Sequence, residues 1–240
     1  MLGVQKTIIY YFNITMIFIE NIKKKAKSIN KLYPNAEVID VTSRASLPFV
    51  RFSPLYPHGN IPVPFSPNTY SYSVEGIWQG LKVFESTDID ISKFEIQTMK
   101  GIKRTARTFG KPIGHRKGIN GSDILDYLTS RKQIYLPTYA WLLQNKVTDE
   151  IAQLMNIALH KDLVLLDFST NDDIENPEKP LSHAALLKMF IEKKHPELKE
   201  KIFDCQANQK GKLKKTKRIN KKTSKNLSKN QDEAQISMDF

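Results

Sequence analysis

Three polar side chains that suit chemistry at a sugar carbon fall within one short apolar stretch of this 240-residue chain. Glu75, Gln79 and Lys82 lie in residues 73–84, at spacings of four and three residues. Side chains at these spacings stack along one face of an α-helix. The sequence therefore predicts a carboxylate, an amide and an amine in a row, which supplies acid–base help and a nucleophile. An ordinary salt bridge or a solvated stripe is the alternative.

A helix over residues 73–84 must carry this row, and the apolar residues of that stretch recur on its neighbouring face. Upstream, the composition predicts a basic helix over 20–33 and a strand rich in β-branched residues over 36–42. Downstream, helices are predicted over 92–109, 123–132, 137–145, 148–160 and 182–194. These elements predict an α+β, predominantly helical fold.

Residues 47–68 form a proline-rich segment that cannot hold regular structure for long. They contain six of the twelve prolines together with four aromatic residues, Tyr56 among them. The aromatic residues predict a segment that is packed down. It forms either one wall of a ligand pocket, with Tyr56 as a substrate contact, or a cover over the core.

An apolar run over 162–168 ends in a polar loop. The run is a buried strand or the end of a helix, and the loop over 169–175 is rich in Asn and Asp. Asp167, Asn171 and Asp172 are candidates to hold ribose hydroxyls. Turn chemistry of Asn and Asp side chains explains the same composition without a ligand.

Cationic and titratable groups gather over residues 100–117, a stretch without a single acid. The eight groups are Lys100, Lys103, Arg104, Arg107, Lys111, His115, Arg116 and Lys117. Such a cluster predicts either a phosphate-binding surface, with Arg104 and Arg107 as the main contacts, or a solvated face.

The net charge of +12 is distributed unevenly along the chain. Residues 206–240 hold ten Lys or Arg against three Asp or Glu, so this end carries more than half of the excess. We predict a globular domain over 16–200 and a disordered basic tail over 201–240. The tail either binds nucleic acid electrostatically or serves as a solubilising end. Residues 1–15 are expected to be an extension, since Met16 is a second plausible start.

Composition also excludes several classes of protein. Cys205 is the single cysteine, so no intramolecular disulfide can form, and a cytoplasmic setting fits best. The five histidines are scattered, and we expect neither a metal site nor a cofactor. The apolar stretch over 8–19 is too short to span a bilayer.

The order of these pieces resembles the NADAR superfamily, N-glycosidase-like proteins that act on ADP-ribose-linked and related nucleotide compounds. Phe52-Ser-Pro-Leu-Tyr-Pro57 stands in the place of a Ser-Asn-Phe-Tyr-Pro-like loop. Ser73-Val-Glu-Gly-Ile-Trp-Gln-Gly-Leu-Lys82 resembles a Thr-Val-Glu-His-Tyr-Tyr-Gln-Ala-x-Lys helix, and Lys103-Arg-Thr-Ala-Arg107 resembles a Lys-Arg-x-x-Arg element. The chain departs from the pattern at Gly76, where the superfamily has His, and it lacks the Trp-Gly that follows the acidic loop.

The resemblance implies hydrolysis of a ribose N-glycosidic bond in a nucleotide or ADP-ribosyl compound, with removal of ADP-ribose from DNA bases as one form. Glu75 would give acid–base help and Lys82 would attack the anomeric carbon. Trp78 would stack on the base beside Gln79. The alternative function is a non-catalytic, nucleic-acid-associated binding protein that docks on a replication or repair partner, and an accessory structural protein of phage or host defence is a third.

The last six residues carry a partner motif of their own. Gln235-Ile-Ser-Met-Asp-Phe240 resembles the short peptide by which many bacterial DNA-processing proteins dock on the replication sliding clamp. Met238 and Phe240 would fill an apolar pocket while Gln235 makes polar contacts.

Overall fold

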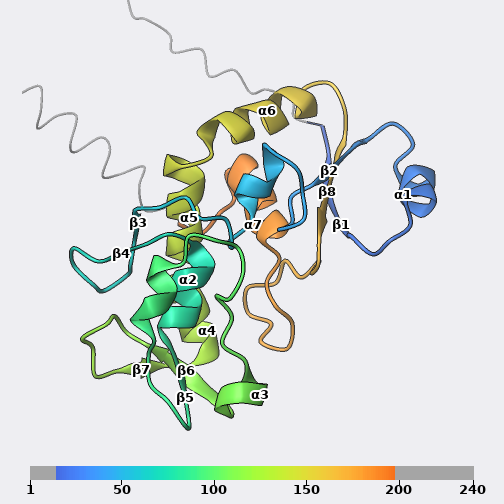
Figure 1. The fold of residues 1–240 in the computed structure, drawn as a ribbon. Helices are drawn as coiled ribbons and strands as arrows, with labels where there is room; N and C mark the ends of the chain where they lie inside the picture. The colour runs from blue at the N-terminus through green and yellow to red at the C-terminus, as the bar shows by residue number, and fades with distance from the viewer. Residues whose placement is uncertain (1–14, 198–240) are drawn as a thin grey trace, which may run out of the picture. The chain divides into compact units, whose positions relative to one another are not determined.

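Three strands that are far apart in the sequence form a parallel sheet in the order β1–β8–β2 (Figure 1). The computed structural model describes residues 15–197. Strand β1 covers Ile17–Asn21, β2 covers Glu37–Asp40, and β8 covers Leu163–Asp167 between them. Strand β8 is buried almost throughout, as its continuous apolar run requires of a central parallel strand. Of the two alternatives for residues 162–168, the strand is therefore the one that forms.

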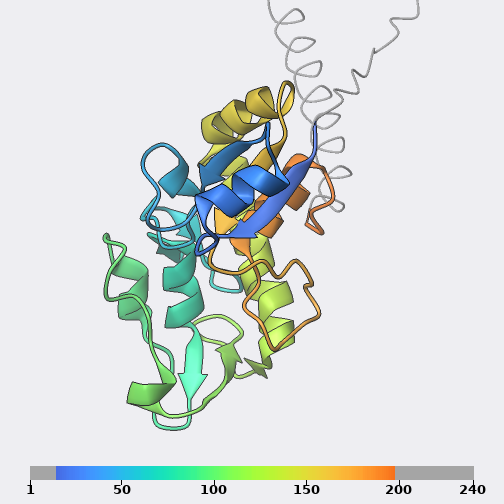
Figure 2. The same ribbon diagram turned by 90° about the vertical axis from the view of Figure 1, so that its right-hand side faces the viewer.

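Helices pack on this sheet and on one another to form the core. Helix α7 (His183–Ile191) packs on β8 and β1, and α5 (Leu136–Asn145) packs on α7. Helix α5 also packs against α6 (Thr148–Ala158) and α2 (Val74–Gly80). Figure 2 shows helix α1 (Ala26–Leu32) on the outer side of the sheet.

The proline-rich segment is ordered and packs on the core. It holds the 3₁₀-helix η1 (Phe49–Phe52) and, farther on, β3 (Ile61–Pro62), which pairs with β4 (Tyr70–Ser71). Phe52 is fully buried, and its carbonyl oxygen accepts a hydrogen bond of 2.9 Å from the hydroxyl of Tyr139 on α5. This contact fixes the segment to the helix layer.

The structure corrects the helix predicted over 73–84, which ends at Gly80. A Cβ at position 80 would lie 2.3 Å from Cε1 of Phe94, so the chain passes too close to Phe94 for a larger residue. Beyond it, β5 (Lys82–Phe84) pairs antiparallel with β6 (Pro112–Arg116), and β6 pairs with β7 (Ile124–Leu125). Lys82 therefore lies at the start of a strand.

Two other predicted helices are also wrong in part. Residues 92–109 contain only η2 (Ile91–Glu95) and α3 (Ala106–Phe109), and between them the chain bends and the backbone N–H of Arg104 bonds to the Gln79 side chain. Residues 123–132 divide into β7, α4 (Tyr127–Ser130) and the start of a π-helical turn, η3 (Arg131–Tyr135). With three sheets among the described residues, the fold is a mixture of helix and strand rather than predominantly helical.

Helix α2, which carries the polar row, begins at a well-formed cap. Ser73 Oγ accepts a hydrogen bond of 2.9 Å from the backbone N–H of Gly76. We expect Ser73→Ala to lower the free energy of unfolding by about 1 kcal/mol, measured by urea denaturation. Ser46→Ala, at an exposed serine, is the control and should change it by less than about 0.5 kcal/mol. Equal effects of the two changes would contradict the capping role.

Some predictions lie outside the described residues. These include the basic tail and the docking residues Gln235, Met238 and Phe240, as well as most of the N-terminal extension. Thr15 is described, and its backbone N–H donates to the carbonyl of Ala158 at 2.8 Å. No helix in the described part of the chain is long and apolar enough to cross a bilayer.

Candidate functional site

The predicted polar row is present and is connected by hydrogen bonds. The Gln79 amide nitrogen donates to Glu75 Oε1 at 2.8 Å, and Lys82 Nζ donates to Gln79 Oε1 at 3.0 Å. The backbone N–H of Arg104 donates to the same amide oxygen, also at 3.0 Å. The buried amide of Gln79 therefore fixes the carboxylate and the amine relative to each other.

The row lines a cavity of about 410 Å³, a size typical of small-molecule sites. Its walls come from α2, the start of β5, the chain before α3, the α4–η3 segment and the chain before α7. The lining residues are Glu75, Trp78, Gln79, Lys82, Lys103, Tyr127, Arg131, Tyr135, Pro180 and Leu181. The two predicted catalytic residues and two predicted substrate contacts, Trp78 and Gln79, are thus brought together.

The amine of Lys82 is shifted toward its neutral form. Burial lowers the pKa of Lys82 below its ordinary value, Glu75 opposes this shift, and the charges of Arg104 and Lys103 add to it. Only a neutral amine can act as a nucleophile, so the lowered pKa favours covalent chemistry at this position.

His115 stands directly across from Lys82 in the β5–β6 pair. Its ring packs against Trp78 at a tilt of 32°, with centroids 3.7 Å apart, and it is 3% exposed. Burial, together with the charge of Lys82, lowers the pKa of His115 to about 3. The imidazole is therefore neutral near pH 7 and supports Trp78 as an aromatic backing.

Sequence reasoning missed the wall formed by Tyr127, Arg131 and Tyr135. These residues follow one another at intervals of four, a spacing that places them on one face of a helix and could have revealed them. Arg131 and Tyr135 are the two ends of the π-helical turn, a feature that is frequent at functional sites. Both side chains line the cavity.

Tyr135 offers the cavity a hydrogen-bond donor. Burial, with the charges of Glu75 and Asp167, raises its pKa well above the ordinary value, so the hydroxyl keeps its proton. Within residues 15–197 that hydroxyl has no hydrogen-bond partner. It is therefore available to a ligand oxygen.

The two buried arginines serve the fold. Arg104 donates to the carbonyl oxygens of Lys82 and Asp88, at 2.5 and 2.7 Å, and its guanidinium stacks on the ring of Phe84. Arg131 donates to three carbonyls of the loop over 174–179 and so holds that loop against the π-helical turn. Backbone carbonyl oxygens therefore accept hydrogen bonds from guanidinium N–H groups of Arg104 and Arg131 that could otherwise bind a phosphate.

The structure does not bring Arg107 or Tyr56 to the cavity. Arg107 is exposed on α3, while the neighbouring Lys103 lines the cavity in its place. Tyr56 packs against the ring of His58, with centroids 4.8 Å apart, and lies under the guanidinium of Arg51.

The polar side chains of Asp167 and Asn171 also bond to other groups of the protein. Asp167 is 3% exposed and accepts from Ser182 Oγ at 2.7 Å and from His183 Nδ1 at 3.0 Å. Asn171 donates to the carbonyl oxygen of Lys179. Asp172 is exposed and is not one of the residues that line the cavity. Because Ser182 bonds to Asp167 and not to His183, this group is not a nucleophile–base pair.

Gly76 marks the departure from the NADAR-like pattern, and packing explains it. A Cβ at this position would lie 2.7 Å from both the carbonyl oxygen of Lys93 and Ser71 Oγ. A histidine therefore does not fit here without moving η2. No group of three or more metal-ligating side chains occurs among the described residues.

Residues 21–187 match a protein family described as a family of unknown function (DUF6939). The matched range covers most of the chain and includes every residue that lines the cavity. A search of curated proteins gave no match.

Proposed function

The chain belongs to the family of unknown function DUF6939, and we propose that it is an N-glycosidase-type hydrolase. It cleaves the bond between a ribose anomeric carbon and a nitrogen in a nucleotide or ADP-ribosyl compound. The observation that carries this proposal is the hydrogen-bonded row of Glu75, Gln79 and Lys82 along one wall of a ligand-sized cavity.

The row suits a two-step reaction with a covalent intermediate. The neutral Lys82 amine attacks the anomeric carbon, the carbon–nitrogen bond to the leaving group breaks, and the Glu75 carboxyl gives that nitrogen a proton. The lysine nitrogen then passes a proton to the ring oxygen, and the sugar opens to a Schiff base. Water, deprotonated by Glu75, adds to the same carbon. Glu75 gives its proton to the lysine nitrogen and takes the proton of the new hydroxyl as the carbon–nitrogen bond breaks, which frees the amine and leaves an aldehyde. The C4 hydroxyl of the sugar then adds to the aldehyde carbon and closes the ring to the hemiacetal product.

The remaining walls suit the rest of such a substrate. Trp78 and Tyr127 line the cavity and contact each other edge to face, with ring centroids 6.0 Å apart, and they provide an aromatic wall for a planar base. The Tyr135 hydroxyl can donate to a ribose oxygen, and the exposed Lys103 supplies a cation for a phosphate. ADP-ribose on a DNA base contains all of these parts.

A non-catalytic nucleic-acid-binding protein is the second candidate. It is favoured by Lys100, Arg107 and Lys111, which are exposed and form no ion pair among the described residues. Such a protein would bind the same ligand and release it unchanged.

The two candidates differ in product formation. The protein is incubated with DNA that carries ADP-ribosylated guanine, and released ADP-ribose is measured by mass spectrometry. We expect release, and we expect Glu75→Gln to reduce it by about 10²–10⁴-fold, because the leaving nitrogen then lacks its proton donor. Glu85→Gln, at an exposed acid, is the matched control.

Two results would contradict the proposal. Full activity of Glu75→Gln would remove Glu75 from the mechanism. Binding of ADP-ribose with no release by the unaltered protein would favour the binding protein.

A further inference from the structure

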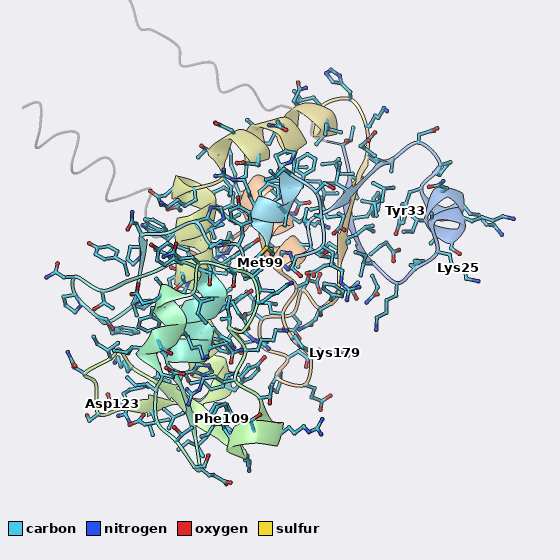
Figure 3. The ribbon with its side chains drawn as sticks, in the orientation of Figure 1. Lys25, Tyr33, Met99, Phe109, Asp123 and Lys179 are labelled. Atoms are coloured by element: carbon cyan, nitrogen blue, oxygen red, sulfur yellow. The ribbon has the colours of Figure 1, made fainter. Side chains whose placement is uncertain are left out.

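Helix α1 and the residues before it form a basic surface that the proposed function does not use. We define the α1 basic surface as Lys23, Lys25, Lys27 and Lys31, all of which are exposed. No acidic residue occurs in residues 21–36. Figure 3 shows Lys25 at the periphery of the molecule, while Tyr33 lies on the side of α1 that faces the sheet. The surface shares no residue with the cavity.

The ammonium groups of the four lysines form no ion pair and no hydrogen bond among residues 15–197. Their neighbour Lys24 is different and pairs with Glu20 at 2.7 Å. Elsewhere on the surface, lysines do meet acids: Lys132 pairs with Glu175, and both Lys188 and Lys194 reach Glu192. Among the described residues, no ion pair therefore compensates the charge of the α1 basic surface.

Helix α1 also departs from the local rules that stabilise a helix. Its N-cap, Lys25, gives no side-chain hydrogen bond, and its first turn contains no acid. Lys27 and Lys31 are four residues apart and repel each other. Only Ile29 of this helix is buried. Features that cost local stability without a packing gain are expected where a surface serves a partner.

We propose that the α1 basic surface binds the phosphate backbone of a nucleic acid. Lys27 and Lys31 are separated by about 6 Å along the helix axis. This rise is close to the roughly 7 Å between alternate phosphates on one strand. A polyanion laid along the helix would also relieve the repulsion between the lysines.

The composition of α1 argues against two other kinds of anionic partner, a membrane surface and an acidic protein. An interfacial membrane helix needs a broad apolar face, but Ile29 is taken by the core and Leu32 is the one remaining aliphatic residue of α1 with a large side chain. Protein interfaces are depleted in lysine and enriched in aromatic residues and arginine. The exposed part of α1 shows the opposite composition.

The test compares two triple variants of the full chain in binding to a fluorescently labelled DNA duplex. Lys25→Gln/Lys27→Gln/Lys31→Gln removes three charges from the surface. Arg44→Gln/Lys179→Gln/Lys193→Gln is the control and removes three exposed charges that form no ion pair among the described residues, at scattered positions. Anisotropy titrations are run between about 50 and 200 mM salt. Residues 198–240 are present in both variants, so their contribution cancels.

We expect the slope of log K against log salt to become shallower by about 3 in the α1 variant, since each lost phosphate contact removes about 0.9. The control should change it by less than about 1. Equal slopes for the two variants would overturn the proposal. Loss of binding to phosphatidylserine vesicles with an unchanged DNA slope would overturn it in favour of a membrane. Both variants keep the cavity, so ADP-ribose release tests the proposed function separately.

Discussion

Replacing Lys82 by alanine is expected to lower kcat/KM for ribosyl release by on the order of 10³-fold or more, because the reaction then loses its nucleophile. The fold should survive, since Lys82 is half-buried and, within residues 15–197, its amine bonds only to the side chain of Gln79. Release of ADP-ribose is measured by mass spectrometry alongside the unfolding transition of each protein.

A conservative variant and a chemical trap separate the nucleophile from a purely electrostatic role. Lys82→Arg keeps the positive charge, but a guanidinium stays protonated in proteins and cannot attack, so it should be as inactive as Lys82→Ala. Cyanoborohydride delivers hydride to the Schiff base and leaves a stable secondary amine. The unaltered protein should then carry the added ribosyl mass on the peptide that contains Lys82. Activity of Lys82→Arg within about tenfold of normal would contradict a covalent role.

The same mechanism fixes the direction of the pH dependence. The reactive amine is neutral, whereas Glu75 must carry a proton to act as the acid. In Glu75→Gln, which removes this second requirement, the residual kcat/KM should rise with pH through the pKa of Lys82 in the free enzyme. Burial places that pKa below the ordinary 10.5, and the midpoint of the rise should lie below this value.

Replacing Asp167 by asparagine is expected to lower the free energy of unfolding by about 3–5 kcal/mol, because it leaves a buried charge without its partner. His183 Nδ1 lies 3.0 Å from Asp167 Oδ2, and His183 Nε2 lies 2.8 Å from the carbonyl oxygen of Val41. Both oxygens accept, so both ring nitrogens carry a proton and His183 is an imidazolium. The pair joins β8 to the start of α7.

The pH dependence of this pair has a defined sign. Burial opposes the charged forms, yet the charge of Asp167 raises the pKa of His183 above 6.5, and the charge of His183 lowers the pKa of Asp167 below 3.8. The stabilisation by His183 is complete below 6.5 and is lost as pH rises through its raised pKa. That by Asp167 is complete above 3.8 and is lost as pH falls through its lowered pKa.

The difference between the unaltered protein and Asp167→Asn should therefore be largest between pH 3.8 and 6.5 and should shrink at alkaline pH. The two proteins must be compared at each pH because other groups also change the stability of both. Burial lowers the pKa values of His58, His115 and His195, so these neutral histidines weaken the fold of either protein as pH falls below 6.5. Urea denaturation at about pH 5.5 and about pH 9 measures the difference. Asp172→Asn, at an exposed position, is the control. A loss that is the same at both pH values would rule out the charged pair.

Local sequence was enough to predict the helices whose apolar periodicity and end residues lie within the helix itself. The apolar periodicity and caps of residues 137–145, 148–160 and 182–194 correspond to α5, α6 and α7. The i, i+4 spacing of Glu75 and Gln79 also placed these two side chains together on α2, whereas Lys82 joins the row from the start of β5. The hydrogen bonds of that row join residues only three and four positions apart.

Tertiary structure alone decided the elements whose partners are far along the chain. Strand β5 forms because β6, some thirty residues later, pairs with it, and the same register sets His115 opposite Lys82. The predicted phosphate ligand Arg104 became a fold contact because carbonyls of β5 and of the turn after it reach its guanidinium. Asp167 was taken by α7 in the same way.

The cavity is also a feature that only the tertiary structure decides. Its walls come from segments between residues 75 and 181, and no local pattern states which of them will meet. Sequence spacing fixes contacts within a helix, because geometry repeats every few residues. Contacts between segments depend on which buried polar groups find partners when the whole chain packs. This packing brings Tyr135 and Lys103 to the cavity, whereas Arg104 and Asp167 bond to other parts of the fold.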